Sequence, residues 1–150
     1  MDNKTVTIDA REFFARINLA DKVVRGGAFK GVRECRLDLE RKGGELIPVD
    51  DGILLGSVGG DTVDKGHVIS AEVSYNTPYA AAVHERMIPA PAPSFGTQMH
   101  PGPKTRAKPG NEFGPAGGHY LRRPLIGKAN QYWQHIAKTI QRALDAKGKI

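Results

Sequence analysis

Apolar side chains recur along the chain with two different periods. In residues 69–75 apolar and polar positions alternate, which is the pattern of a half-buried strand. In residues 20–46 and 124–146 they recur at steps of three and four, which predicts two long amphipathic helices. The apolar stripe of the first helix comprises Val24, Ala28, Val32, Cys35, Leu39 and Leu46, and that of the second comprises Ile126, Ala129, Trp133, Ile136, Ile140 and Leu144. We expect both stripes to be buried, with Trp133 as a core anchor.

The N-terminal region carries the signals of a short helix ahead of the long one. Asp9 and Glu12 have the spacing of a capping box, which predicts a short helix that ends near Ile17. We expect this helix to bury an apolar face that consists of Phe13, Phe14 and Ile17. The pair Gly26-Gly27 lowers the helix propensity of the longer segment and leaves open a break within it.

The centre of the chain predicts strands that lead into a short helix. In chain order the segments are a turn at 48–52, a turn of helix entering a strand at 53–58, a hairpin connection at 61–66 and a strand at 67–75. Thr77 is placed to cap the following helix, and Pro78 suits its first position because it lacks an N–H. Tyr79, Ala82 and Val83 would form the packed face of that helix. We therefore predict an α+β fold: a small antiparallel β-sheet packed against a long N-terminal helix and a C-terminal helix.

Residues 88–118 differ in composition from the rest of the chain. They contain seven of the ten prolines and six of the eighteen glycines, and few large apolar side chains. A structureless segment of this length within one domain usually carries function or disorder. Two interpretations remain open: a solvated loop, or an arm that becomes ordered only against a neighbouring molecule. We treat residues 1–150 as a single domain, with 88–118 as a long Pro/Gly-rich insertion loop or arm.

Positive charge is concentrated in the last third of the chain. The formal net charge is +6, and residues 101–150 alone hold ten Lys and Arg residues against two Asp and Glu. Such a surface suits nucleic acid, an acidic protein surface or simple solubility. The candidate contacts for DNA or a partner are Lys104, Arg106, Lys108, Arg122, Arg123 and Lys128. No helix-turn-helix, zinc-finger or RNA-binding aromatic motif accompanies them.

The sequence lacks the usual signatures of catalysis and metal binding. His84-Glu85 matches the start of the zinc-protease motif, but the second histidine of that motif would fall at Ile88. The five histidines have no tight metal spacing, and the lone Cys35 is expected to be a small buried hydrophobe. No run of about 18 apolar residues predicts a membrane span. We therefore expect no enzyme, no metal, no cofactor and no small-molecule substrate.

Three segments, in this order along the chain, resemble one family of bacteriophage proteins. The family is that of the small tail-completion or head-to-tail joining proteins of long-tailed phages, often described as minor tail components. The segments are ELIPVDDGILLGSV at 45–58, VSYNTPYAAAVHE at 73–85 and HYLRRPL at 119–125. The positions that carry the resemblance, with Tyr120 in place of the family's Phe, are Pro48, Asp50, Gly52, Ser57, Tyr79, Ala80, Val83, His84, Glu85, Tyr120, Leu121 and Pro124. The chain departs from the pattern at Asp51 and Leu55, where the family has Thr and Arg.

The resemblance implies a structural role in the virion. It implies an α+β subunit, without catalytic residues, that assembles in the host cytoplasm into a ring, usually sixfold, at the head–tail neck or the top of the tail. Its partners would be copies of itself and other neck and tail proteins, and DNA in the channel is a further candidate. The alternatives are a basic nucleic-acid-binding module and a small hydrolase built around His84 and Glu85.

Overall fold

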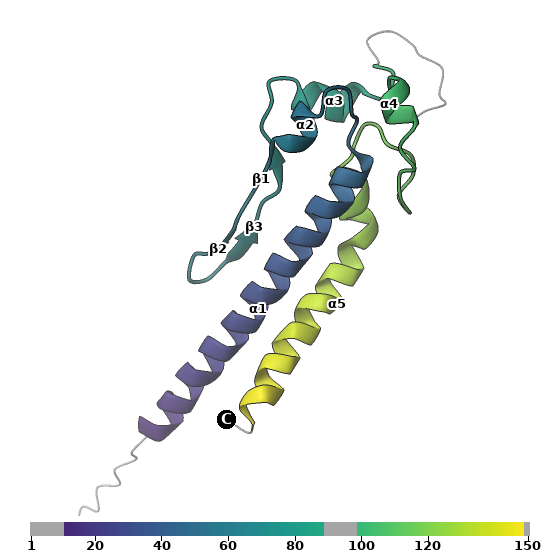
Figure 1. Cartoon of the computed structure of the whole chain (residues 1–150). Coiled ribbons are helices and arrows are strands. Elements are labelled where there is room, and N and C mark those ends of the chain that lie inside the picture. The colour runs from purple at the N-terminus through teal and green to yellow at the C-terminus, as the bar shows by residue number, and fades with distance from the viewer. Residues whose placement is uncertain (1–10, 89–98, 149–150) are drawn as a thin grey trace, which may run out of the picture.

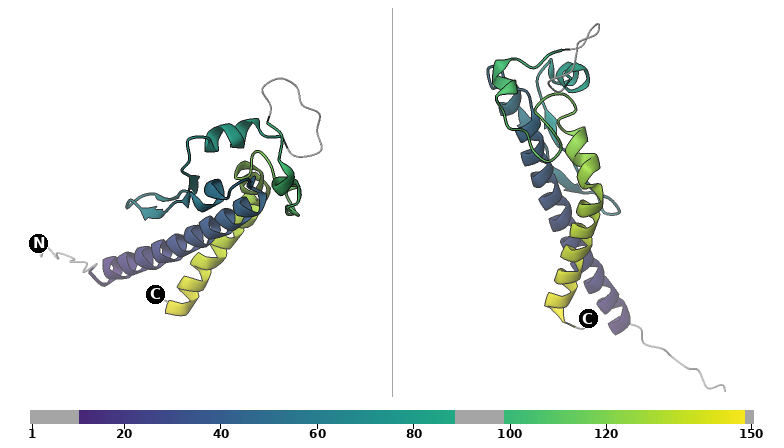
Figure 2. Two further views of the ribbon diagram at one scale, coloured as in Figure 1. Left: turned by 45° about the horizontal axis from the view of Figure 1, so that its top comes forward. Right: turned by 90° about the vertical axis from the view of Figure 1, so that its right-hand side faces the viewer.

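The structure, a computed structural model, describes residues 11–88 and 99–148 (Figure 1). Two long helices dominate it, α1 (Arg11–Leu46) and α5 (Arg122–Lys147). They lie side by side in opposite directions, and most other elements gather where α1 ends and α5 begins (Figures 1 and 2). We call this end the head. The combination of long helices and short antiparallel strands confirms the α+β class predicted from the sequence.

Helix α1 is one unbroken helix of 36 residues. The prediction of a separate short helix ending near Ile17 was therefore wrong, and the break that the sequence left open at Gly26-Gly27 does not occur. Its buried positions are Gly27, Gly31, Cys35, Gly43 and Leu46, which confirms the prediction that Cys35 is buried. A Cβ atom added at Gly27 would lie 2.8 Å from the Cα of Ile140 in α5. The glycines therefore permit a close approach of two helix backbones, and tertiary packing overrides their low helix propensity.

Helix α5 occupies the predicted segment, but its buried face differs from the predicted stripe. Thr139 is buried against α1, whereas the side chains of Ile126 and Trp133 are 65% and 72% exposed. The prediction of Trp133 as a core anchor was therefore wrong. Polar side chains of α5 pair with α1 instead, through Lys128 to Asp38 at 2.5 Å, Tyr132 to Asp38 at 3.0 Å and His135 to Glu34 at 2.7 Å. These pairs and the glycines of α1 set the rotation of α5 about its axis.

The first turns of α1 extend beyond the end of α5 (Figure 2). Phe13, Phe14 and Ile17, which the sequence predicted to be buried, are 63%, 60% and 47% exposed. The two phenylalanine rings meet edge to face with their centroids 5.8 Å apart. Asp9, the predicted cap, lies outside the described residues. An apolar end of α1 is therefore open to solvent in the single chain.

The strands form two short antiparallel ladders within one hairpin. Helix α2 (Ile53–Gly56) leads to β1 (Val58–Gly59), which pairs with β4 (Ser74–Tyr75), while β2 (Thr62–Asp64) pairs with β3 (Ile69–Ala71). The predicted connection at 61–66 therefore contains a strand, and the turn lies at 65–68. The β2–β3 part of the hairpin runs along α1, where an ion pair between Arg25 and Asp64 joins them (Figure 1).

The core of the head joins segments that are far apart in the sequence. Its buried side chains are Leu46, Ile47, Leu54, Tyr75, Ala80, Val83, Met87 and Tyr120. Tyr120 is 2% exposed, donates its hydroxyl to the Ala80 carbonyl at 3.2 Å and packs edge to face on Tyr75. Helix α3 (Ala80–Arg86) begins later than predicted. The Thr77 side chain does not cap it, and the Thr77 carbonyl instead accepts a hydrogen bond from the Ala80 N–H at 3.1 Å.

Residues 99–118 of the predicted insertion pack against the C-terminal end of α1. Helix α4 (Pro103–Arg106) carries Thr105, whose hydroxyl bonds both the N–H and the carbonyl of Val49, at 2.9 and 3.0 Å. The ammonium of Lys108 donates to two carbonyl oxygens at the end of α1, where a helix leaves acceptors without partners. This part of the insertion is therefore anchored to its own chain. Residues 89–98 of the predicted arm lie outside the described residues.

Candidate functional site

The three segments that resemble the phage family meet in the head, and most of their matched residues have structural roles. Gly52 has a φ of 87°, a left-handed value that other residues rarely adopt. The hydroxyl of Ser57 donates to the Leu54 carbonyl at 2.8 Å, which closes α2. The buried members of the matched set are Pro48, Ala80, Val83, Tyr120 and Pro124, and Leu121 is partly buried against them. The matched positions thus hold the head together.

A groove of about 620 Å³ lies between the first two segments and α4. Its lining includes the matched residues Pro48, Asp50, Gly52, Tyr79 and Val83. At its edge the ammonium of Lys104 donates to the Asp50 carbonyl at 2.6 Å. Residues matched to the family in two separate segments therefore share one depression of the surface.

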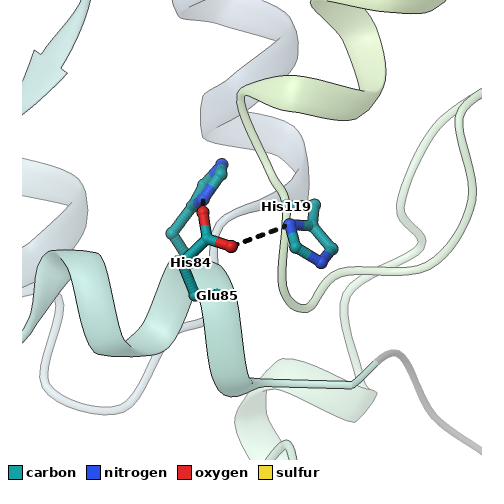
Figure 3. Close-up of side chains that lie close together, drawn as sticks. All are labelled: His84, Glu85 and His119. Atoms are coloured by element: carbon teal, nitrogen blue, oxygen red, sulfur yellow. Dashed lines mark hydrogen bonds and ion pairs between the residues drawn. The ribbon is translucent and has the colours of Figure 1, made fainter.

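Two histidines and one glutamate come together where the second and third segments touch (Figure 3). His84 and Glu85 lie near the end of α3, and His119 lies in the turn before α5. The Nδ1 atom of His84 is 2.8 Å from Glu85 Oε1, and the Nδ1 atom of His119 is 4.0 Å from Glu85 Oε2. Among the described residues, these three form the one group of at least three His, Cys, Asp or Glu side chains whose donor atoms all lie within 4.8 Å of one another.

The backbone around His119 fixes its ring beside His84. His119 has a φ of 54°, the one positive value among the non-glycine residues that the structure describes. Its N–H donates to the His84 carbonyl at 2.7 Å. Gly118 allows this approach, because a Cβ there would lie 1.8 Å from the Met87 carbonyl oxygen. The imidazole rings of His84 and His119 then meet edge to face at 5.4 Å, and the His84 ring also packs on Tyr120 at 4.9 Å.

The surroundings favour the charged form of Glu85. The hydrogen bond with His84 lowers the pKa of the Glu85 carboxyl, and the nearby positive charge of Arg122 lowers it further. The Glu85 side chain is 62% exposed, His119 is 38% exposed and His84 is 19% exposed. The cluster therefore presents an anionic oxygen beside two imidazole nitrogens on a surface that solvent reaches.

The sequence identified His84-Glu85 but missed His119 as its partner. The zinc-protease motif requires a second histidine four residues after His84, where the chain has Ile88. The third side chain of the cluster instead comes from a position 35 residues after His84. The available signal was that both positions lie in segments that the sequence had singled out, at 73–85 and 119–125. The second and third segments bring His84 and His119 together directly in the head.

The six basic residues predicted to contact DNA or a partner are used differently. Four of them bind groups of their own chain: Lys104, Lys108, Arg123 and Lys128. Arg123 donates to the carbonyls of Phe113 and Pro115 at 3.1 and 2.9 Å, which explains a positive charge next to the start of α5. Arg106 and Arg122 are exposed. A contact with DNA or an acidic partner by the described residues therefore rests first on these two.

Comparisons with known proteins identify no relative of this chain, so a functional conclusion rests on the sequence and on the local geometry. No helix among residues 11–88 and 99–148 is long and apolar enough to cross a membrane. The chain matches no protein-family model, no curated protein and no solved structure.

Proposed function

We propose that this chain is a structural virion protein of a tailed bacteriophage. It forms a homo-oligomeric ring, a hexamer as in the family that it resembles, at the head–tail neck or the top of the tail. The ring completes the tail and joins it to the capsid connector through other neck and tail proteins, and the subunit has no catalytic role. The phage assignment rests on the resemblance of the three segments. The observation that carries the assembly is the exposed apolar surface on both long helices.

Two separate apolar surfaces support contacts between copies. The first, the α1 tip, consists of Phe13, Phe14 and Ile17, all of them at least 47% exposed. The second, the α5 face, consists of Ile126 and Trp133, which are 65% and 72% exposed. Exposed apolar patches of this kind mark interaction sites, and tryptophan is enriched among residues that dominate binding energy.

Two different surfaces on one subunit suit a ring better than a symmetric dimer. In a heterologous interface one patch of each copy binds a different patch of the next copy, and the series closes when the rotation permits. The α1 tip lies far from the head, whereas Ile126 lies within the first turns of α5, beside it. A tip of one copy bound to the α5 face of the next would bury both surfaces at every interface.

The expected energetic contribution of Trp133 is large. A tryptophan buries about 150–250 Å² on entering an interface. Truncation of an interface residue of this kind typically costs about 2–4 kcal/mol. Since about 1.4 kcal/mol corresponds to a tenfold change in dissociation constant, Trp133→Ser should weaken each contact by roughly 30- to 1,000-fold.

The proposal is tested by sedimentation velocity on the purified chain and three variants. Trp133→Ser and Phe14→Ser should dissociate the ring, while Val68→Ser, a control at a 50% exposed position in the hairpin turn, should leave it intact. At a concentration below that of ring formation, unfolding in urea should be nearly unchanged in all three, because each side chain is largely exposed in the single subunit. A wild-type chain that stays monomeric at every concentration contradicts the proposal.

The nucleic-acid-binding module remains a second candidate because Arg106 and Arg122 are exposed. It predicts that DNA binding by the subunit weakens as salt rises, with a slope that falls when both arginines are replaced by Gln. Absence of binding at low salt removes this candidate and leaves the ring proposal untouched.

A further inference from the structure

We propose that His84, Glu85 and His119 form a binding site for a divalent metal ion of the zinc class. Two imidazole nitrogens and a carboxylate oxygen are a donor set that Zn²⁺ uses when it keeps its fourth position open. The donors come from two elements, the end of α3 and the turn that precedes α5 (Figure 3). A bound ion would therefore join the second and third segments of the head.

The present distances are close to those that a metal requires. Zinc bonds to nitrogen and oxygen of about 2.0–2.2 Å place tetrahedral ligands roughly 3.4 Å apart. The separation of 2.8 Å between His84 Nδ1 and Glu85 Oε1 and that of 4.0 Å between His119 Nδ1 and Glu85 Oε2 bracket this value. One donor atom from each of the three side chains lies within 4.8 Å of the other two. Glu85 is 62% exposed, so rotation of its side chain can equalise the two distances without disturbing the core.

One further observation points to a ligand at this position. The Nδ1 atom of His119 is buried, yet it has no hydrogen-bond partner among the described residues, and 4.0 Å to Glu85 is too long for one. A metal ion would supply the partner that this buried nitrogen lacks.

The charges around the cluster permit a cation. Glu85 supplies one negative charge, and imidazole ligands bind a metal in their neutral form and add none. Arg122 lies near enough to influence Glu85 and opposes a bound cation, so the affinity should be lower than that of a fully enclosed zinc site. The exposure of the Glu85 carboxylate leaves a path for the ion and room for water as a fourth ligand.

The experiment is a calorimetric titration of the full chain, freed of any polyhistidine tag and of metal, with zinc chloride. The wild type should bind one zinc ion per chain at this site, and zinc should raise its melting temperature. Glu85→Gln keeps the shape of an exposed side chain, and His119→Asn keeps a residue that tolerates a positive φ. Each should weaken zinc binding by at least about tenfold, as loss of groups at metal sites typically does.

The matched control is Glu34→Gln in α1. Glu34 pairs with His135 at 2.7 Å, so the control removes a carboxylate beside a histidine that belongs to no three-donor group among the described residues. It should leave zinc affinity unchanged. Circular dichroism establishes that each variant keeps the helices of the wild type. The proposal is overturned if the wild type binds no zinc, or if folded Glu85→Gln and His119→Asn bind it as tightly as Glu34→Gln does.

Discussion

The packing of α1 on α5 depends on the absence of side chains at Gly27 and Gly31. A Cβ at Gly27 would lie 2.8 Å from the Cα of Ile140 and 3.1 Å from the Cβ of Ala143. A Cβ at Gly31 would lie 2.9 Å from the Cα of Ile136. Carbon atoms in contact prefer separations of about 3.5–4.0 Å, so Gly27→Ala must push the helices apart by roughly 1 Å. The nearest obstacle is backbone, which cannot rotate away as a side chain does.

Two opposing effects set the magnitude for Gly27→Ala. Alanine is more favourable than glycine within a helix by about 0.8–1 kcal/mol. Overpacking of a close contact costs about 1–3 kcal/mol. At the neighbouring Gly26 no atom lies within 4 Å of an added Cβ, so Gly26→Ala should show the gain in helix propensity without an overpacking cost. Gly26→Ala should therefore stabilise the chain, and Gly27→Ala should be less stable than Gly26→Ala by about 1–3 kcal/mol.

The assay is urea unfolding followed by circular dichroism, with the two alanine variants compared at one protein concentration. Because Gly26 and Gly27 are adjacent in one helix, propensity effects cancel in the comparison and the contact with α5 remains. If the two variants have equal dependence of unfolding free energy on urea concentration, the difference between their unfolding midpoints measures the difference in stability. If Gly27→Ala stabilises as much as Gly26→Ala, the helices do not pack backbone to backbone and the reasoning is refuted.

Three further substitutions probe the head and the seam between the helices. Lys108→Met removes the donor to the carbonyls of Gly44 and Ile47, at 2.9 and 2.8 Å. It should lower the urea unfolding midpoint by the equivalent of about 1–2 kcal/mol. Lys104→Met, at an exposed position, is the control and should change the midpoint little. Gly118→Ala should cost about 2 kcal/mol or more, because its Cβ would meet the Met87 carbonyl, and Gly102→Ala, with open space around it, is the thermal-melting control. Burial would raise the pKa of Asp38, but hydrogen bonds from Lys128, Arg41 and Tyr132 outweigh it and hold the pKa below its ordinary value. The stabilisation by Asp38 is therefore present above the ordinary Asp pKa of about 3.9 and lost as pH falls through the lower folded value. Asp38→Asn should destabilise at neutral pH and converge with the wild type in acid, and parallel pH profiles of the unfolding midpoint would contradict this.

The sequence predicted those elements whose signal is local. The period of apolar residues located α5 within two residues at its N-terminal end and one at its C-terminal end, and the alternation at 69–75 located β3 and β4. The burial of Cys35 also followed from its place in a helical stripe. These features depend on residues within a few turns of one another.

The sequence failed where contacts between distant segments decide the outcome. A stripe of glycines carries no hydrophobic signal, so the seam at Gly27 and Gly31 was invisible, and the rotation of α5 that exposes Trp133 could not be predicted. The anchoring of residues 99–118 depends on hydrogen bonds from Lys108 to the end of α1 and between Thr105 and Val49 just after it. No local sequence pattern predicts these contacts. The pairing of His119 with His84 likewise requires the fold of the head.

The central claim is that this subunit assembles into a closed ring through the α1 tip and the α5 face. Native mass spectrometry of the purified chain tests it most directly. We predict one dominant species with the mass of six chains, which Trp133→Ser converts to monomer. A wild type that remains monomeric, or a hexamer that persists unchanged in Trp133→Ser, would contradict the account.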